Sequence, residues 1–467
     1  MSHVAIVLAA GKGTRMKSSL PKVLHPVAGR PMLHWVLDAV TGSKPERVVV
    51  VVGHGAQLVA EGLGDGYEAA VQEEQHGTGH AAGVGLAALK GIDERAAVLV
   101  VPGDTPMLDA ATLDRLLASH AAAGASVTVA STELSDPSGY GRVVRREDGS
   151  VTGIVEEGDA DAATRAIREV NAGMYVFRAG DLARDLSELT TDNAQAELYL
   201  TDVVGIAAAR GRLVIAEPAD PEVVAGVNDH AQLAAAASTH RRRMVERWMA
   251  EGVRMIDPDR VYLDHDVTLA PGVTLYPNVI LEAGTSVEEG ATVGPDVYAA
   301  ASQIGSGARV WYAVVRSSVV GEACTVGPYA SLRPGSVIER GAHLGTFVET
   351  KNTTVGEGSK VPHLSYMGDA TIGARANIGA GTITCNYDGF AKYRTTIGDG
   401  AFIGSDTMLI APVAIGDGAM TAAGSAISRD VGPGELGVER AKQHNIPGFV
   451  ERLAARYRAK RTEETPS

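Results

Sequence analysis

The stretch Thr396–Gly418 reads TIGDGAFIGSDTMLIAPVAIGDG and carries an aliphatic residue at every sixth position: Ile397, Ile403, Leu409 and Ile415. Glycine directly follows three of the four. A period of six is too short for a repeat that contains a helix. It fits one flat side of a triangular coil, with the aliphatic side chain inside and a small residue at the tight corner. The sequence therefore predicts a solenoid of stacked β-coils.

The same phase extends through much of the C-terminal half. It recurs at Val320, Val326, Leu332, Ile338 and Leu344, then at Ile372 and Ile378. This pattern resembles the hexapeptide-repeat, left-handed parallel β-helix. The phase breaks near Thr346–Thr354 and again at Asn386–Thr395. We interpret the second break as a loop that leaves the solenoid, a place where functional residues often lie.

Residues 1–229 have a different texture. Short β-branched runs at 4–7, 48–52, 98–101 and 127–129 alternate with helical stretches at 31–39, 79–89 and 111–121. Strands that alternate with helices predict crossover units and a Rossmann-like α/β domain with a mostly parallel sheet. Ligands of such sheets bind at the carboxyl ends of the strands.

Residues 230–252 contain no helix breaker and are predicted to form one linker helix between the domains. The third segment, 253–467, is the predicted β-helix domain with a C-terminal tail. The tail from Leu453 to Ser467 is charged, and we expect a helix that fades into disorder.

The composition excludes several classes of protein. The net charge of −14 disfavours nonspecific nucleic-acid binding, which needs a basic surface. The two cysteines have no metal-binding spacing. No signal peptide is recognised and no apolar run reaches the ~18 residues of a membrane span, so we expect a cytoplasmic protein.

The first strand leads into LAAGKGTRM at Leu8–Met16, followed by Pro21-Lys22. Small residues let backbone N–H groups approach an anion, and Lys12, Arg15 and Lys22 add positive charge. The third glycine of a dinucleotide fingerprint is missing, and so is the P-loop pattern. Alone, this loop could be a flexible surface turn.

The loop resembles the signature of sugar-1-phosphate nucleotidyltransferases. The segments that follow it are QEEQHGTG at 72–79, Gly103-Asp104, GYGR at 139–142, Val155-Glu156, NAG at 171–173 and Val227-Asn228. In order and spacing they resemble the family of bifunctional N-acetylglucosamine-1-phosphate uridylyltransferases/glucosamine-1-phosphate acetyltransferases. The resemblance extends from residue 4 to about 440.

The resemblance implies a site for UTP and for the UDP-N-acetylglucosamine product. Its residues would be Leu8, Ala9, Ala10, Gly11, Lys12, Gly13, Arg15, Lys22, Gln72, Gly77, Thr78, Gly141, Glu156, Asn171 and Asn228. Gln72 and Gly77-Thr78 would hold uracil, and Gly141, Glu156 and Asn171 would hold the sugar. Asp104 and Asn228 would bind Mg²⁺, with Mn²⁺ as the alternative ion, since both metals accept oxygen ligands. Some relatives have an aromatic residue where this chain has Pro102, which leaves one wall of the sugar pocket open to question.

Polar residues also gather where the six-residue repeat becomes irregular. Among them are Arg333, Lys351, His363 and Lys392. In a solenoid, residues one to three coils apart stack along one edge, so these side chains can converge. A lone histidine in such a segment is more often a packed or surface residue. An amine that attacks a thioester must lose a proton, however, and histidine suits that task.

The segment NYDG at 386–389 resembles the acetyltransferase half of the same family. The resemblance makes His363 the general base. Glucosamine-1-phosphate would be bound by Arg333, Lys351, Tyr366 and Asn377, and acetyl-CoA by Ala380, Asn386, Tyr387, Ser405, Ala423 and Arg440. Ser405 is either an oxyanion or proton-transfer residue or simply a small residue at a turn.

The family implies bifunctional synthesis of UDP-N-acetylglucosamine for peptidoglycan and other envelope glycans, in a homotrimer formed through the β-helix. Acetyl transfer from acetyl-CoA would precede uridylyl transfer from UTP. Two alternatives remain: a nucleotidyltransferase for another sugar phosphate with a purely structural β-helix, and a non-catalytic sugar-nucleotide sensor.

Overall fold

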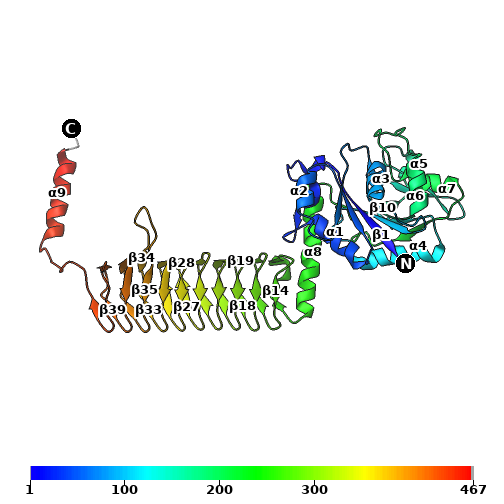
Figure 1. Cartoon of the computed structure of the whole chain (residues 1–467). Coiled ribbons are helices and arrows are strands. Elements are labelled where there is room, and N and C mark those ends of the chain that lie inside the picture. Colours follow the sequence, from blue (N-terminus) through cyan, green and yellow to red (C-terminus); the bar gives the residue numbers. More distant parts are fainter. Residues whose placement is uncertain (1, 464–467) are drawn as a thin grey trace. The chain divides into compact units, whose positions relative to one another are not determined.

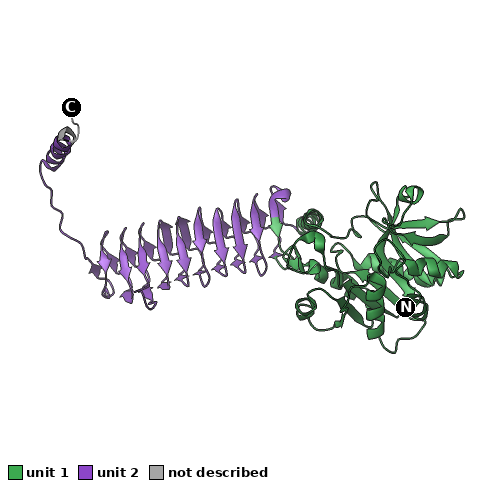
Figure 2. Ribbon diagram, turned by 90° about the horizontal axis from the view of Figure 1, so that it is seen from above, with its two compact units in different colours: residues 1–250, 262–267 green, residues 251–261, 268–467 purple. Residues whose placement is uncertain are grey.

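The computed structural model describes residues 2–463, which form two compact units. Unit 1 comprises residues 1–250 and 262–267, and unit 2 comprises residues 251–261 and 268–467 (Figure 2). The predicted tail from Leu453 is helical as far as Glu463, within α9 (Phe449–Glu463), and residues 464–467 lie outside the described residues. No helix among residues 2–463 is long and apolar enough to span a membrane.

The sheet of unit 1 has the order β11-β7-β10-β6-β1-β4-β5. Its strands are β1 (His3–Ala9), β4 (Val48–Val52), β5 (Glu68–Val71), β6 (Ala97–Pro102), β7 (Val127–Glu133), β10 (Glu169–Arg178) and β11 (Val214–Pro218). Two further strands, β8 (Arg142–Arg145) and β9 (Val151–Val155), branch from β10. A separate hairpin pairs β2 (Pro26–Val27) with β3 (Arg30–Pro31).

The sheet is parallel across β5, β4, β1 and β6, as the alternating pattern predicts. The prediction of a mostly parallel sheet is confirmed, and β11 is also parallel to β7; the exception on this path is β10, which runs antiparallel to both β6 and β7. Local strand patterns do not reveal direction, which depends on how the connecting segments return. The carboxyl ends of β1 and β6 still lie side by side, with Leu8 opposite Pro102.

Helices cover both faces of this sheet (Figure 1). They are α1 (Met32–Gly42), α2 (Ala56–Glu61), α3 (Thr78–Ala88), α4 (Ala110–Ala123), α5 (Ala162–Arg165), α6 (Ala179–Leu186) and α7 (Asp202–Ala209), with the 3-10 turns η1 (Thr14–Met16) and η2 (Lys22–Leu24). Strand β4 consists of five buried valines, as expected for a strand covered on both faces.

The predicted linker helix is α8 (His230–Ala250). It packs within unit 1: Leu233 and Ala237 contact the buried cluster of Val27, Met32 and Val227. Around the division between the units lie β12 (Arg254–Met255), η3 (Pro258–Arg260) and β13 (Val261–Leu263).

Unit 2 is a parallel β-helix with three sheets, whose strands stack coil upon coil (Figure 1). We call the sheets face 1, face 2 and face 3. Face 1 contains β12, β15 (Thr274–Leu275), β18 (Thr292–Val293), β21 (Arg309–Val310), β24 (Thr325–Val326), β27 (His343–Thr346), β30 (Lys360–His363), β33 (Asn377–Ile378), β36 (Phe402–Ile403), β39 (Met420–Thr421) and β41 (Leu436–Gly437).

Faces 2 and 3 complete each coil. Face 2 contains β16 (Val279–Leu281), β19 (Val297–Ala300), β22 (Ala313–Arg316), β25 (Ala330–Leu332), β28 (Glu349–Lys351), β31 (Tyr366–Gly368), β34 (Ile383–Cys385), β37 (Met408–Ile410) and β40 (Ala426–Ile427). Face 3 contains β14 (Thr268–Leu269), β17 (Ser286–Val287), β20 (Gln303–Ile304), β23 (Val319–Val320), β26 (Val337–Ile338), β29 (Thr354–Val355), β32 (Ala370–Ile372), β35 (Thr395–Ile397) and β38 (Val413–Ile415).

The hexad residues form the core of the prism, as predicted. Ile397, Ile403, Leu409 and Ile415 are all buried. Most coils advance by 16 to 18 residues, since Thr292 pairs with Arg309, Arg309 with Thr325 and Thr325 with His343. Ala370, in contrast, pairs with Thr395, because the predicted loop after Asn386 is inserted in that coil and projects from the prism (Figure 1).

Candidate functional site

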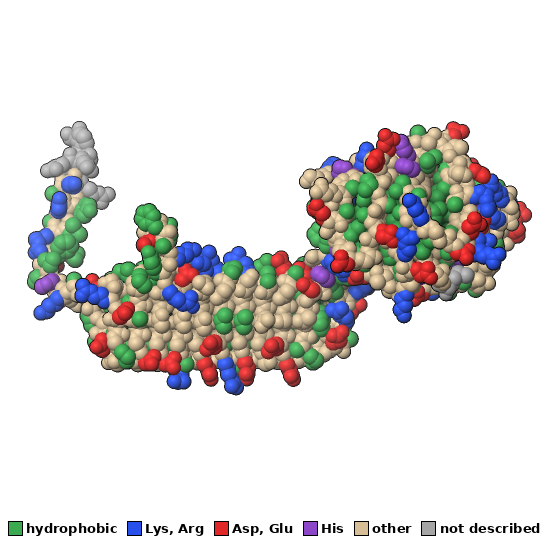
Figure 3. All heavy atoms as spheres, in the orientation of Figure 1, with side chains coloured by type: hydrophobic (Ala, Val, Ile, Leu, Met, Phe, Trp, Pro, Cys, Tyr) green, Lys and Arg blue, Asp and Glu red, His purple; other side chains and the backbone are tan. Residues whose placement is uncertain are grey.

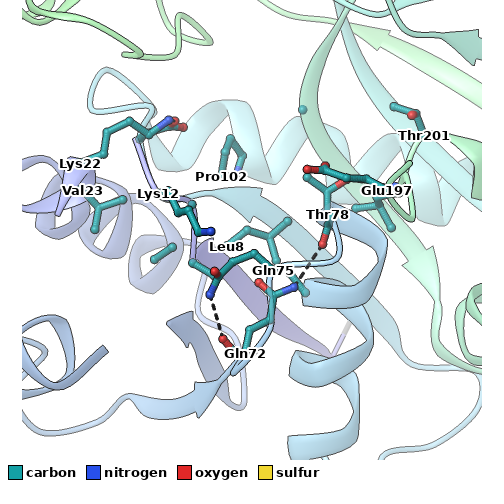
Figure 4. A pocket seen from close by; sticks show the side chains of 18 of the residues that line it. Leu8, Lys12, Lys22, Val23, Gln72, Gln75, Thr78, Pro102, Glu197 and Thr201 are labelled. Atoms are coloured by element: carbon teal, nitrogen blue, oxygen red, sulfur yellow. Dashed lines mark hydrogen bonds and ion pairs between the residues drawn. The ribbon is translucent and has the colours of Figure 1, made fainter. Parts of the chain in front are cut away.

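Unit 1 contains a cavity of about 470 Å³ at the carboxyl ends of β1 and β6. Twelve of the residues predicted for the nucleotide, sugar and metal line it: Leu8, Ala9, Ala10, Gly11, Lys12, Lys22, Gln72, Gly77, Thr78, Asp104, Glu156 and Asn171. Figure 4 shows Lys22 and Val23 on one side of the cavity and Thr78, Glu197 and Thr201 on the other. A parallel sheet brings these loops together because neighbouring strands end at the same edge.

Four predicted residues do not line the cavity. Arg15 is exposed on η1. Gly13 (φ 59°) backs the lysine side chain: a Cβ there would lie 2.7 Å from Cβ of Lys22. Gly141 packs against Glu156, and Asn228 contacts Lys22.

Lys22, Asp104 and Asn228 form one cluster. The Lys22 ammonium pairs with the Asp104 carboxylate and donates to the Asn228 amide oxygen at 3.2 Å. A backbone hydrogen bond from Val227 N to Asp104 O, 2.9 Å long, brings the two oxygen-bearing side chains together. Both are hard oxygen donors around a positive charge, which fits a Mg²⁺ site.

No group of three or more His, Cys, Asp or Glu residues that could hold a metal ion occurs between residues 2 and 463. Mg²⁺ usually keeps several waters and binds phosphate oxygens of the substrate, so two protein ligands such as Asp104 and Asn228 are enough to hold it.

The sugar end of the cavity contains residues that the sequence did not single out. Asn171 Nδ2 donates to the Tyr175 hydroxyl at 2.6 Å, and Asn171 Oδ1 accepts from Gly173 N at 2.9 Å. These two contacts fix the orientation of the amide. Thr201 donates to Glu156 Oε1 at 3.0 Å.

Burial dominates the electrostatics here. It raises the pKa of Glu156, partly offset by the hydrogen bond from Thr201. It also raises the pKa of Tyr175, which stays a neutral hydroxyl. Tyr175 and Thr201 lie in a strand and beside a helix without any motif, so only the folded chain identifies them.

The uracil end is built from backbone and amide groups. Gln72 Nε2 donates to the Gly77 carbonyl at 3.3 Å and lies 3.0 Å from His80 Nδ1. The Thr78 hydroxyl accepts from Leu200 N at 3.0 Å and keeps its own proton free to donate. Glu197 and Leu200, also absent from the prediction, close this end of the cavity.

Three of the predicted acetyl-CoA residues of unit 2, Ala380, Ser405 and Ala423, follow one corner of the prism. We call the turn between faces 1 and 2 the first corner. Backbone hydrogen bonds from Gly381 to His363, Asp406 to Ala380 and Gly424 to Ser405 place those acceptors at equivalent positions of successive coils. Ala423 continues the row, and Arg440 donates to its carbonyl at 2.8 Å.

The predicted phosphate-binding residues gather at the second corner, between faces 2 and 3. Arg333 directly follows β25, and Lys351 ends β28. Figure 3 shows basic side chains gathered beside the projecting loop. Arg333 Nη1 contacts Glu349 Oε1 at 2.9 Å, and Lys351 Nζ contacts Asp369 Oδ2 at 3.3 Å.

Tyr366 lies on face 2 between these corners. It pairs in register with Glu349, and Lys351 pairs with Gly368. A Cβ at Gly368 would lie 2.4 Å from the Tyr366 hydroxyl, so glycine leaves room for the ring. Asn377 starts β33 on face 1, so the structure does not place its side chain on the face that holds Tyr366.

His363 is exposed at the end of β30, opposite Thr346. Asn386 is buried at the second corner and starts the loop, whereas Tyr387 is exposed within it. The sequence missed Asp369, whose side chain contacts Lys351, Asn352 and Asn386.

Comparisons with known proteins cover both units. Residues 5–247 match the MobA-like NTP transferase domain family, and residues 394–429 match the bacterial transferase hexapeptide family (six repeats). The chain is 48% identical over 455 residues to the bifunctional protein GlmU of Mycolicibacterium vanbaalenii, covering 96% of this chain and 92% of that one. It is 49% identical over 449 residues to the bifunctional protein GlmU of Kineococcus radiotolerans, covering 95% and 91%. Among solved structures, a UDP-glucose pyrophosphorylase complexed with UDP-glucose aligns with a TM-score of 0.43 and 19% identity, covering 52% of this chain and all of that one.

Proposed function

The chain belongs to the family of bifunctional GlmU proteins, and from this premise we propose how its two units divide the chemistry. It is a bifunctional transferase of UDP-N-acetylglucosamine synthesis, with acetyltransferase and uridylyltransferase activities. Unit 2 transfers acetyl from acetyl-CoA to glucosamine-1-phosphate. Unit 1 then joins N-acetylglucosamine-1-phosphate to UTP and releases pyrophosphate.

The observation that carries the assignment of unit 1 is its cavity, which gathers three functional groups of residues. The small-residue loop at 8–13 offers backbone N–H groups and Lys12 to the phosphates of UTP. Gln72, Gly77 and Thr78 hold uracil at one end, and Glu156 and Asn171 hold the sugar at the other.

The reaction at this site is an in-line attack by the sugar phosphate oxygen on the α-phosphorus of UTP. Such transfers depend on positioning and charge stabilisation, so no protein nucleophile is required. Asp104 and Asn228 hold Mg²⁺ (or Mn²⁺), which when bound neutralises phosphate charge. Lys22, whose ammonium pairs with Asp104 at this site, adds positive charge beside the phosphates.

At the prism, His363 accepts the proton that the amine of glucosamine-1-phosphate loses as it attacks the thioester carbonyl. Arg333 and Lys351 bind the acceptor's phosphate, for which a guanidinium and an ammonium are suited. The row from Ala380 to Ala423 contacts the coenzyme along the first corner. Ser405 is exposed on this row, where its hydroxyl can donate to the developing oxyanion.

We propose a homotrimer formed through the β-helix, and the position of Asn377 supports it. Asn377 projects from face 1, whereas Tyr366 projects from face 2, so one prism presents the acceptor-binding residues on two sides. A neighbouring copy laid alongside brings its own Asn377 to the site of the first. UTP and acetyl-CoA are cytoplasmic metabolites, and we place the enzyme in that compartment.

An exposed apolar row at the first corner supports this packing. Tyr312, Tyr329, Phe347 and Leu364 occupy successive coils, with ring centroids 5.4 Å apart between neighbouring aromatics. Light scattering should give three times 48.4 kDa for the wild type and a smaller mass for Phe347→Glu. A monomeric wild type with full acetyltransferase activity would refute the trimer.

The functional assignment is tested by two assays on the same purified protein with Mg²⁺. One follows thiol release from acetyl-CoA plus glucosamine-1-phosphate, and the other follows pyrophosphate release from UTP plus N-acetylglucosamine-1-phosphate. His363→Ala should lose only thiol release, by about 10²–10⁴-fold. Asp104→Ala should lose only pyrophosphate release. A wild type that releases pyrophosphate but never thiol would make the β-helix purely structural.

A further inference from the structure

Asp369 occupies the second corner directly after β31, in the left-handed region with φ 49°. Asn352 occupies the equivalent corner one coil earlier with φ 47°, and Asn386 lies at this corner one coil later. A corner needs only a residue that tolerates this backbone, as Ser317 does with φ 44°. The side chain of Asp369, however, makes more contacts than a corner requires.

The carboxylate joins three coils. Its Oδ1 accepts from Asn352 Nδ2 at 2.7 Å, and its Oδ2 accepts from Lys351 Nζ at 3.3 Å and from Asn386 Nδ2. Burial opposes its ionisation, but hydrogen bonds from Asn352, Asn386 and Lys351 lower the pKa of Asp369 overall. The group is therefore a carboxylate at neutral pH and can accept from all three donors at once.

Asp369 also holds both ends of the projecting loop. The Asn386 side chain, at the loop's start, donates to the carboxylate, and Thr395 N, at the loop's end, donates to the Asp369 carbonyl at 3.2 Å. Within the loop, Tyr393 N donates to Asn386 O at 2.9 Å, and Tyr387 bridges to Lys392. Near the loop's end, Arg394 also donates to Thr371 Oγ1 at 2.9 Å and to Ala370 O at 3.3 Å. Asp369 is therefore the anchor at the start of the loop, where Asn386 and Tyr387 lie.

We propose that Asp369 is a positioning residue that links the acceptor subsite to the coenzyme subsite of unit 2. Its carboxylate fixes the Lys351 ammonium where it meets the phosphate of glucosamine-1-phosphate. The same carboxylate fixes Asn386, and with it the loop that carries Tyr387, where they meet acetyl-CoA. This assignment rests on the acetyltransferase function proposed above.

Two substitutions test the link. Asp369→Asn replaces one acceptor oxygen by an NH₂ group that faces donors, and Asp369→Ser keeps a residue type that Ser317 shows is tolerated at this corner. Each should raise the KM values for both glucosamine-1-phosphate and acetyl-CoA by about tenfold, as expected for lost hydrogen bonds to a charged group. The kcat value should change less, and pyrophosphate release should not change.

Asp296→Asn is the matched control. Asp296 is also a left-handed corner residue, with φ 53°, and its carboxylate accepts from Asn278 Nδ2 at 2.8 Å, one coil earlier. It contacts no residue of the predicted sites. This variant should keep both KM values at the wild-type level. Any loss it does show is the effect of removing a corner hydrogen bond away from the site.

A second measurement does not depend on catalysis. Phe390 in the loop is 96% exposed and is a site for chymotrypsin. Cleavage there should be faster in Asp369→Asn and Asp369→Ser than in the wild type or Asp296→Asn, because the loop has lost an anchor.

The outcomes distinguish a failure of the acetyltransferase function from a failure of the role proposed for Asp369. A wild type without thiol release defeats the acetyltransferase assignment itself. With an active wild type, the link is overturned if only one KM rises, if neither rises, or if Asp296→Asn shows the same losses. Parallel rises in both KM values, faster loop cleavage and unchanged pyrophosphate release support it.

Discussion

Units 1 and 2 bring distant residues together by different means. In unit 1, loops at the ends of different strands converge, so residues from Leu8 to Thr201 line one cavity. In unit 2, the coil repeats, and residues 16 to 18 positions apart stack along a corner. The first arrangement buries its polar groups and shifts their pKa values, as at Glu156, whereas the second leaves His363 exposed. The residues that line the cavity all belong to unit 1, whereas the proposed trimer would place a partner copy against the edge site of unit 2.

Removal of the divalent metal should produce the largest difference between the activities of the two units. With excess chelator, pyrophosphate release should fall to background, because Asp104 and Asn228 would have no ion to neutralise phosphate charge. Thiol release should stay within about twofold, since the acetyl transfer proposed for unit 2 uses a histidine base and basic side chains rather than a metal ion. Pyrophosphate release that persists without metal would mean that Lys12 and Lys22 supply enough positive charge without an ion.

Two glycines with similar backbone angles test how tightly each site is packed. Gly77 has φ 104°, and a Cβ there would lie 2.6 Å from Leu198 O, whereas Gly389 has φ 99° and nothing within 4 Å. Gly77→Ala should therefore cost more than about 2 kcal/mol of stability and displace Gln72, lowering pyrophosphate release about 100-fold. Gly389→Ala should cost about 1 kcal/mol and affect thiol release only. Equal losses in thermal melting and in both assays would contradict the packing difference.

Tyr175→Phe is a smaller and more specific change in unit 1. It removes the hydroxyl that accepts from Asn171 at 2.6 Å but keeps the buried ring. One lost hydrogen bond of about 1 kcal/mol should raise the KM for N-acetylglucosamine-1-phosphate by about fivefold and leave the KM for UTP unchanged. Steady-state kinetics with each substrate varied in turn would show whether the amide of Asn171 binds the sugar.

The smallest expected effect is that of His120, which changes the stability of unit 1 only in acid. Burial lowers the pKa of His120, on α4, to about 4, and its ring lies 2.9 Å from the Thr128 hydroxyl. The unfolded chain binds a proton near pH 6.5 and the folded chain only near pH 4, so stability is full above 6.5 and falls as the pH drops between these values. The loss should be about 2 kcal/mol by pH 4.5. Between pH 7 and 4.5, the melting temperature should fall less for His120→Gln than for the wild type. An identical fall would show that His120 does not cause the loss of stability in acid.

Some of this architecture could be predicted from the sequence. The six-residue phase requires a short coil with an aliphatic interior, so the β-helix followed from local pattern alone, and so did the loop after Asn386. The Leu8–Gly11 loop could be placed at a strand end because a buried β-branched run leads directly into it. Each of these features depends on residues close together in the chain.

The tertiary structure alone decided which residues meet. A register shift within β10, between Asn171 and Tyr175, lets these two side chains meet at the cavity, and the segment before α7 brings Thr201 to Glu156, without a motif at Tyr175 or Thr201. The hexad phase marks the interior but not the corners, because the residues per coil vary. Which corner residue lies above which, and hence that Asp369 contacts Lys351 and Asn386, depends on that variation. A hydrogen bond between coils forms only when two side chains lie within a few ångströms of each other. The sequence period determines such distances for the repeated aliphatic residues of the interior, but not for the corner residues.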